Sequence, residues 1–219
     1  MKKTFAQLKP ATLSSRIAQS IEEAILRGDL KPGERISAHN LARQFNVSHI
    51  PVREALKRLE AIGVIVQEPN VGARVPELSS EEIKKILEVR KVLEGLAASL
   101  AAPNMDEHQQ QRLGELVKKM REASKSKDFI SMFAADNQFH RILWDLTGNP
   151  FLVKSLGMLL LPYFGYLAAR GYYVHREQLS YVPKVHQEIL DALSTRDGDH
   201  ARKAIQSVHD RSIQWLPTE

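Results

Sequence analysis

Apolar residues near the start of the chain recur every three or four positions, in three short runs that polar and turn residues separate. The first run, with Ile17 and Ile21 on one face, predicts an amphipathic helix that ends at Gly28. Two more short helices are predicted, because Ser37 and Ser48 can each cap a run with helical spacing. The chain is therefore expected to open with three helices, of which the second and third are joined by a very short turn.

The pattern changes after the third predicted helix. Residues 64–67 and 73–75 are mostly apolar or β-branched, and the turn between them contains Pro69 and Gly72. These features predict a two-stranded hairpin. Three helices followed by a hairpin are the element order of a winged helix-turn-helix, which we place at residues 10–76.

The rest of the chain has helical periodicity and contains no strand candidate. A short linker follows residue 76, and we predict an antiparallel all-α bundle of about six helices at residues 79–216. The predicted fold class is therefore mainly α. The six helices are expected near residues 80–101, 106–126, 128–147, 150–171, 176–195 and 198–214.

The formal charge is unevenly divided between these two parts. Residues 1–76 hold twelve Lys and Arg against seven Asp and Glu, whereas residues 77–219 hold nineteen of each kind. A basic unit beside a neutral one is typical of a nucleic-acid-binding module attached to a second domain, although a difference of this size also arises by chance. The chain has no cysteine, which excludes disulfides and thiolate metal sites. It shows no apolar run of bilayer length and no signal peptide, so we expect a cytoplasmic protein without membrane contact.

The third predicted helix carries the side chains that would enter a DNA major groove. An arginine there can contact guanine through two hydrogen bonds or clamp a phosphate. The alternative is that these residues are solvated charges on amphipathic helices. The exposed positions of the third helix are Ser48, His49, Ile50, Arg53, Lys57 and Arg58, and Arg43 projects from the second helix.

Residues 32–65 resemble the DNA-binding domain of the GntR family of bacterial regulators, most specifically at Val52-Arg53-Glu54-Ala55-Leu56. The resemblance covers about the first 75 residues. It implies double-stranded DNA as a partner, with contacts from Arg35, His39, Arg43, Ser48, His49, Ile50, Arg53, Lys57 and the wing residue Gly72.

Two positions depart from the family pattern, because relatives commonly carry arginine where this chain has His39 and His49. A neutral imidazole lacks the two-pronged donor of a guanidinium, so we expect a different base preference. We also expect DNA binding to strengthen as the pH falls into the range in which imidazoles become protonated.

Four titratable residues lie on faces of the predicted bundle that are otherwise apolar: Asp136, His140, His186 and His209. Asp136 and His140 are four positions apart and therefore share one helical face. Three helices thus direct a carboxylate or an imidazole toward the interior. This set of donors suits zinc, nickel or a similar divalent ion. The alternative is a hydrogen-bonded cluster with a purely structural role.

Residues 79–216 resemble the FCD ligand-binding domain, which is the sensor half of FadR-type members of the GntR family. The resemblance is carried by residues 88–94, by Asp136-Asn137-Gln138-Phe139-His140, and by residues 186–193 together with the later His209. Six helices are typical of the VanR-like branch. Metal-binding members have an aspartate and three histidines at the matching positions, so the resemblance implies a divalent metal cofactor, zinc first, on Asp136, His140, His186 and His209.

The same resemblance implies a pocket for a small organic acid beside the metal. Arg90 matches an arginine near that pocket and could pair with a carboxylate. The alternative for Arg90 is a surface salt bridge with Glu94. Tyr163 could line the cavity, although an aromatic residue at that spacing also fits plain core.

These features predict a homodimeric transcriptional regulator that binds a palindromic operator and responds to an organic acid, with repression as the commoner mode in the family. An enzyme is not expected. A metal-dependent hydrolase with a DNA-binding appendage is the alternative, because an aspartate and three histidines could activate water. Against it, the chain has no HExxH motif, and we identify no inward glutamate spaced as a general base.

Overall fold

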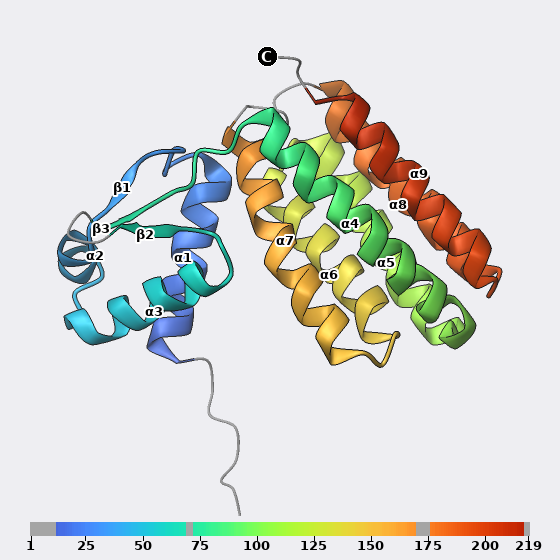
Figure 1. Ribbon diagram of the computed structural model, residues 1–219, viewed down its shortest axis with the longest axis horizontal. Helices are drawn as coiled ribbons and strands as arrows, with labels where there is room; N and C mark the ends of the chain where they lie inside the picture. The colour runs from blue at the N-terminus through green and yellow to red at the C-terminus, as the bar shows by residue number, and fades with distance from the viewer. Residues whose placement is uncertain (1–11, 69–71, 170–175, 217–219) are drawn as a thin grey trace, which may run out of the picture.

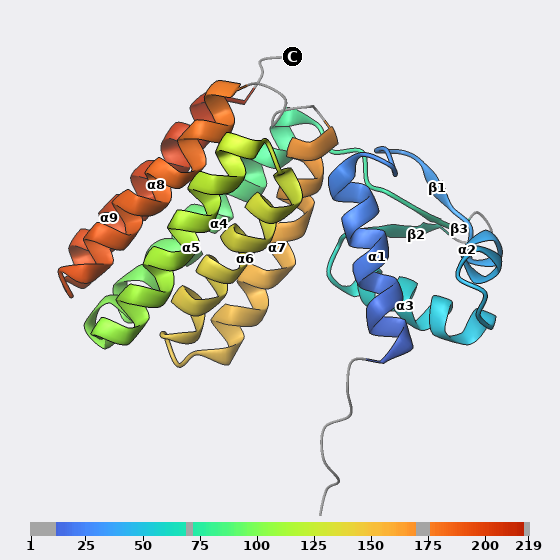
Figure 2. The ribbon, with the colours of Figure 1, turned by 180° about the vertical axis from the view of Figure 1, so that it is seen from behind.

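The computed structural model describes residues 12–68, 72–169 and 176–216, which form two lobes (Figure 1). The N-terminal lobe holds three helices and a small sheet, whereas the C-terminal lobe is a bundle of long helices (Figure 2). Each lobe has its own apolar core. The predicted fold class, a winged helix-turn-helix joined to an all-helical bundle, is confirmed.

The three helices of the N-terminal lobe are α1 (Leu13–Arg27), α2 (Ala38–Gln44) and α3 (His49–Ala61). The hydroxyl of Thr12 caps the start of α1, and Gly28 ends it in the left-handed conformation at φ 76°. Helix α1 packs against α3, so their apolar stripes form the core of the lobe.

The sheet differs from the predicted hairpin, because the described residues contain a third strand. Strands β2 (Val66–Glu68) and β3 (Gly72–Arg74) form the hairpin, and β1 (Arg35–Ile36) pairs antiparallel with the other side of β3. Gly72 begins β3 at φ 104°, a conformation that side chains disfavour. A strand of two residues leaves no alternating pattern, so the sequence held no signal for β1.

The C-terminal lobe contains all six predicted helices, and their bounds lie within two residues of the predicted ones. None of the helices in the described parts of the chain is both long enough and apolar enough to cross a membrane. The elements are α4 (Ser80–Ala101), the short 3-10 helix η1 (Ala102–Asn104), α5 (Glu107–Ser126), α6 (Phe129–Asp145), α7 (Pro150–Ala169), α8 (Arg176–Ser194) and α9 (Gly198–Gln214).

Side-chain caps explain why several of these helices begin where they do. Ser79 and Glu82 form a reciprocal capping box at the start of α4. Asp106, Asp128 and Asp197 accept hydrogen bonds from backbone N–H groups in the first turns of α5, α6 and α9. These caps are local signals, which is why the sequence could place the helices accurately.

Helices α4 and α9 approach each other closely in the bundle. A Cβ atom on Gly198 would lie only 2.6 Å from the backbone oxygen of Ser99, so only glycine fits at the start of α9. This close approach matters for the candidate site, because α4 and α9 both contribute buried polar side chains to the bundle interior.

The two lobes meet along α1, which packs against α6 and α7 of the bundle (Figure 2). Because α1 also packs against α3, one helix connects α3 with the bundle. Helix α6 is thus in contact with the N-terminal lobe on one side and with the bundle helices α4 and α5 on the other.

Candidate functional site

The exposed face of α3 is the candidate nucleic-acid interface. Helix α3 buries Val52 and Leu56 in the core of the lobe and exposes Ile50, Arg53 and Lys57. The side chain of Ile50 is 70% exposed in the first turn of α3. An apolar side chain at the start of a recognition helix can contact the methyl group of thymine, while arginine can contact guanine.

An open cleft of about 790 Å³ lies between α3 and the small sheet. Arg53 and Lys57 line it from α3, Arg35 lines it from β1, and Gly72 lines it at the start of β3. Three predicted DNA-contacting cations and the wing glycine are therefore brought together. Positive side chains on both sides of a cleft suit a phosphate backbone that runs between a helix and a wing.

The two histidines at the expected arginine positions stack on each other. The ring centroids of His39 and His49 are 5.3 Å apart and their planes differ by 23°. Both side chains are exposed, as are Ser48 and Arg43, and Arg43 lies one helical turn after His39 on α2. The expected pH dependence of DNA binding stays a prediction. The wing turn at residues 69–71 lies outside the described residues.

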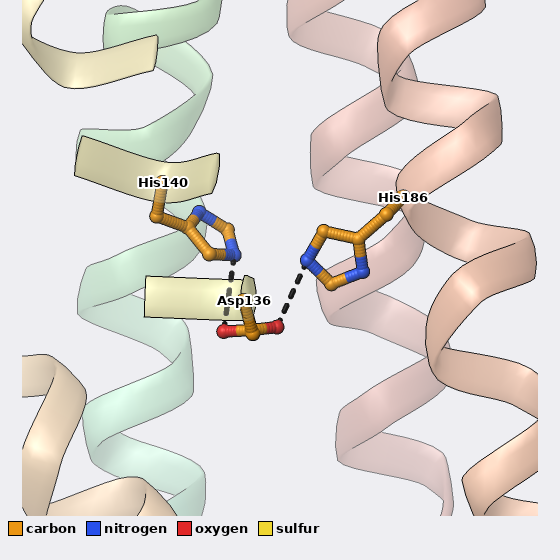
Figure 3. A group of neighbouring side chains, drawn as sticks. All are labelled: Asp136, His140 and His186. Carbon is orange, nitrogen blue, oxygen red and sulfur yellow. Dashed lines mark ion pairs between the residues drawn. The ribbon is translucent and has the colours of Figure 1, made fainter. Parts of the chain in front are cut away.

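Asp136, His140 and His186 converge inside the bundle (Figure 3). Asp136 and His140 lie one turn apart on α6, and His186 extends from α8. The Oδ1 atom of Asp136 is 2.9 Å from His186 Nε2, and its Oδ2 atom is 3.8 Å from His140 Nε2. All three residues are buried, and one potential ligand atom from each lies within 4.8 Å of the others. Two ligands that each lie about 2.0–2.2 Å from zinc are at most about 4.4 Å apart, a range that includes both distances from Asp136.

The orientation of His186 is fixed from its own helix. Its Nδ1 atom donates a hydrogen bond to the backbone oxygen of Val182 at 2.8 Å, which leaves Nε2 facing Asp136. Burial lowers the pKa of His186, but the charge of Asp136, its hydrogen bond and the Val182 carbonyl together raise that pKa above the ordinary value. A metal ion at Nε2 would therefore compete with a proton.

The other two members of the trio have the charge states that metal ligands need. Burial lowers the pKa of His140, more than the charges of Glu94 and Asp136 raise it. Burial raises the pKa of Asp136, but the charges of His186, His140 and Arg90 hold that pKa below its ordinary value. Near neutral pH, His140 is therefore neutral and Asp136 is ionised.

Glu94 is a buried polar residue that the sequence reasoning missed. The sequence reasoning identified no inward glutamate spaced as a general base, but Glu94 on α4 does point inward and is 0% exposed. Arg90 Nη2 and Nε donate to Glu94 Oε1 at 2.6 and 3.0 Å, and His209 Nε2 donates to Oε2 at 3.0 Å. The Oε2 atom is also 3.5 Å from His140 Nδ1. Burial raises the pKa of Glu94, but Arg90, His140 and His209 hold it well below its usual range.

The salt bridge between Arg90 and Glu94 exists, but it does not lie on the surface: the side chain of Arg90 is only 3% exposed. The residue that was predicted to pair with an acidic effector already has an internal carboxylate partner. Tyr163, the other predicted effector residue, lies on α7, but its side chain is outside the described residues.

His209 lies beside the trio and not within it. Its Nε2 atom is bonded to Glu94, and among the described residues it does not belong to the group whose ligand atoms lie within 4.8 Å of one another. Its Nδ1 atom is buried and has no hydrogen-bond partner in the described parts of the chain. Because Nε2 is hydrogen-bonded to Glu94, Nδ1 is the unpaired nitrogen of His209, and the ring would have to move for it to reach an ion held by the trio.

Two family models match the two lobes. The model described as "Bacterial regulatory proteins, gntR family" matches residues 13–75, and the model described as "FCD domain" matches residues 85–210. The chain belongs to the GntR family. Its FCD domain fits the FadR-type subfamily that the sequence predicted.

Similar proteins support the same assignment for this GntR-family chain. A "Probable D-xylose utilization operon transcriptional repressor" of Paenarthrobacter nicotinovorans is 29% identical, with 94% of this chain and 89% of the relative covered. The HTH-type transcriptional regulator LutR of Bacillus subtilis is 30% identical, with 83% of this chain and 90% of the relative covered. The solved structure of E. coli McbR/YncC matches with a TM-score of 0.81 and 25% identity, and the match covers 94% of this chain and 98% of the other. The protein is a transcriptional regulator, and the alternative of a hydrolase is wrong.

Proposed function

We propose that this GntR-family protein is a homodimeric repressor that binds a palindromic operator, and that a small organic acid bound beside a divalent metal ion changes its affinity for DNA. The metal is zinc, or nickel or a similar ion, on Asp136, His140 and His186, with His209 as the fourth candidate ligand. The observation that carries this proposal is the convergence of one carboxylate and two imidazoles in the buried interior of the bundle (Figure 3).

The donors of the trio fit a divalent ion. Two imidazole nitrogens and a carboxylate are ligands that zinc and nickel favour. The Oδ2 atom of Asp136 is buried and has no hydrogen-bond partner in the described part of the chain, which is costly for an ionised carboxylate. A bound divalent ion would compensate that charge and offer an open coordination position to a carboxylate ligand. A purely structural cluster would leave Oδ2 without a hydrogen-bond partner among the described residues.

The DNA-binding part of the proposal is supported by the cleft beside α3. Members of the GntR family bind DNA, and Arg35, Arg53 and Lys57 gather in one cleft on this chain. Repression is proposed because the relative from Paenarthrobacter nicotinovorans is described as a transcriptional repressor.

Homodimerisation is supported by an apolar stripe on the outer face of α4. Val92 is 65% exposed, and the exposed members of the stripe recur at three- and four-residue spacing. Helix α7 lies beside α4 (Figure 1). It carries further exposed apolar side chains. A patch of this kind indicates a contact surface, and a two-fold contact between copies would match a palindromic operator. The stripe consists of Val89, Val92, Leu96 and Leu100, and the additions on α7 are Phe151 and Met158.

The metal site is tested by metal analysis of protein purified without an affinity tag and then incubated with zinc or nickel. We expect about one ion per chain in the wild type and loss of the ion in His140→Ala. His108→Ala is the matched control, because His108 is exposed on α5 and should keep the ion. A wild-type protein that retains neither metal would exclude the proposed centre.

The regulatory part is tested by selecting a preferred duplex from genomic fragments, followed by a thermal-shift screen of organic acids with and without a chelator. An acid that raises the melting temperature only in the presence of metal should then change operator affinity. Acids that stabilise the protein equally after chelation, or that leave DNA binding unchanged, would contradict the proposed coupling.

A further inference from the structure

Glu94 occupies a central position among the buried polar residues of the bundle. It lies on α4, between Arg90 on its own helix and histidines from α6 and α9. The Arg90 guanidinium holds Oε1 through two hydrogen bonds, so the other oxygen is directed toward the two imidazoles. Glu94 is not one of the three candidate metal ligands, so its buried position and its contacts need a separate explanation.

A histidine that binds a metal through one ring nitrogen usually donates the N–H of the other nitrogen to a carboxylate or a carbonyl. This outer hydrogen bond fixes the tautomer and the ring orientation and makes the ligand more basic. His186 follows the rule, since its Nε2 faces Asp136 and its Nδ1 donates to the carbonyl of Val182 at 2.8 Å.

His140 presents the same arrangement with Glu94 in the place of the carbonyl. Its Nε2 faces Asp136 Oδ2, and its Nδ1 faces Glu94 Oε2 at 3.5 Å, slightly beyond hydrogen-bond distance. His140 Nδ1 has no other hydrogen-bond partner in the described residues. A small movement of the ring toward Glu94 would complete the bond.

We propose that Glu94 is a positioning residue of the metal centre: its Oε2 atom orients His140 for the metal and holds His209 beside the trio, while Arg90 fixes the carboxylate. This inference rests on the proposed metal site. The ionised carboxylate is essential to the role, because a charged acceptor makes a stronger hydrogen bond to an imidazole N–H than a neutral amide does.

The experiment measures zinc affinity by competition with a chelating indicator. The test variant is Arg90→Gln/Glu94→Gln, which removes both charges of the buried pair and so leaves no unpaired buried charge. The matched control is Glu81→Gln/Lys85→Gln, the same kind of change at an exposed pair four residues apart on the same helix. We expect the test variant to bind zinc about 10- to 100-fold more weakly than the wild type, and the control to bind like the wild type.

A second measurement separates positioning from stability. Long-range ¹H–¹⁵N NMR of the metal-free proteins reports the His140 tautomer, and we expect the Nδ1–H form in the wild type to give way to the Nε2–H form in the test variant. Unchanged zinc affinity in a folded test variant would overturn the role of Glu94 while leaving the metal site intact. A wild type that binds no zinc or nickel would instead remove the metal site itself, and the role of Glu94 with it.

Discussion

Replacing Arg90 with methionine should strongly destabilise the metal-free protein. The guanidinium is 3% exposed and its partner Glu94 is 0% exposed, with donor–acceptor distances of 2.6 and 3.0 Å. In Arg90→Met the Glu94 carboxylate stays buried with its cationic partner removed. Breaking a buried pair from one side costs about 3 to 5 kcal/mol. For a chain of this size each kcal/mol corresponds to about 2 to 4 °C, so the melting temperature should fall by about 6 to 20 °C.

The assay is thermal and guanidinium unfolding of chelator-treated protein, followed by circular dichroism. The double variant Arg90→Met/Glu94→Leu should recover most of the lost stability, because it removes both charges. A loss below about 1 kcal/mol in Arg90→Met, as for an exposed pair, would refute the reasoning. If that stable variant also lost its response to organic acids, Arg90 would be an effector residue, as the family resemblance implied.

Three other predictions concern DNA binding, assembly and pH. Arg53→Ala should weaken operator binding by about 1 to 3 kcal/mol in fluorescence anisotropy, without lowering the melting temperature, because Arg53 is exposed. The control is Arg121→Ala, at an exposed position on α5 of the bundle, and equal weakening there would show that only general charge matters. Val92→Lys should raise the dimer dissociation constant at least about tenfold in sedimentation velocity, because a valine buried in the dimer contact contributes about 1.5 to 3 kcal/mol per copy. The control Gln110→Lys, on α5, should leave the dissociation constant unchanged. The hydrogen bonds from the Ser79 backbone and hydroxyl lower the pKa of Glu82 from 4.5, so their contribution to stability is present above pH 4.5 and is lost as the pH falls below it. The melting-temperature advantage of the wild type over Glu82→Gln should therefore shrink between pH 6 and pH 3, and a constant difference would argue against the capping box.

The helices of the bundle could be predicted because their signals are local. Caps such as Ser79, Asp106 and Asp128 lie within a few residues of the backbone groups that they satisfy. The convergence of Asp136 with His140 could also be predicted, because a four-residue spacing places both on one helical face. Strand β1 could not, since its two residues pair with β3 almost forty positions later in the chain.

The burial of Glu94 was missed for a different reason, which lies in the composition of α4. This helix carries apolar residues on two faces, one buried in the bundle and one exposed, with Val92 and Leu96 on the exposed face. Hydrophobic periodicity alone does not decide which of two apolar faces points inward. Charged residues are usually exposed, so Glu94 was expected only as the partner of Arg90 in a surface salt bridge, the alternative to an effector role for Arg90. Both residues instead share the inner face with Leu87.

Helix α6 relates the candidate metal centre to the DNA-binding lobe. Asp136 faces the bundle interior, whereas the next residue, Asn137, lines a groove of about 530 Å³ that also includes Glu22 of α1 and Arg58 of α3. A displacement of α6 that accompanies binding at Asp136 would therefore change the surface on which the N-terminal lobe rests. Such a displacement alters DNA affinity only if the effector binds one arrangement of α6 more tightly than another. The coupling free energy between two sites is typically about 1 to 3 kcal/mol. The factor by which the acid changes the affinity for the operator must then equal the factor by which the operator changes the affinity for the acid.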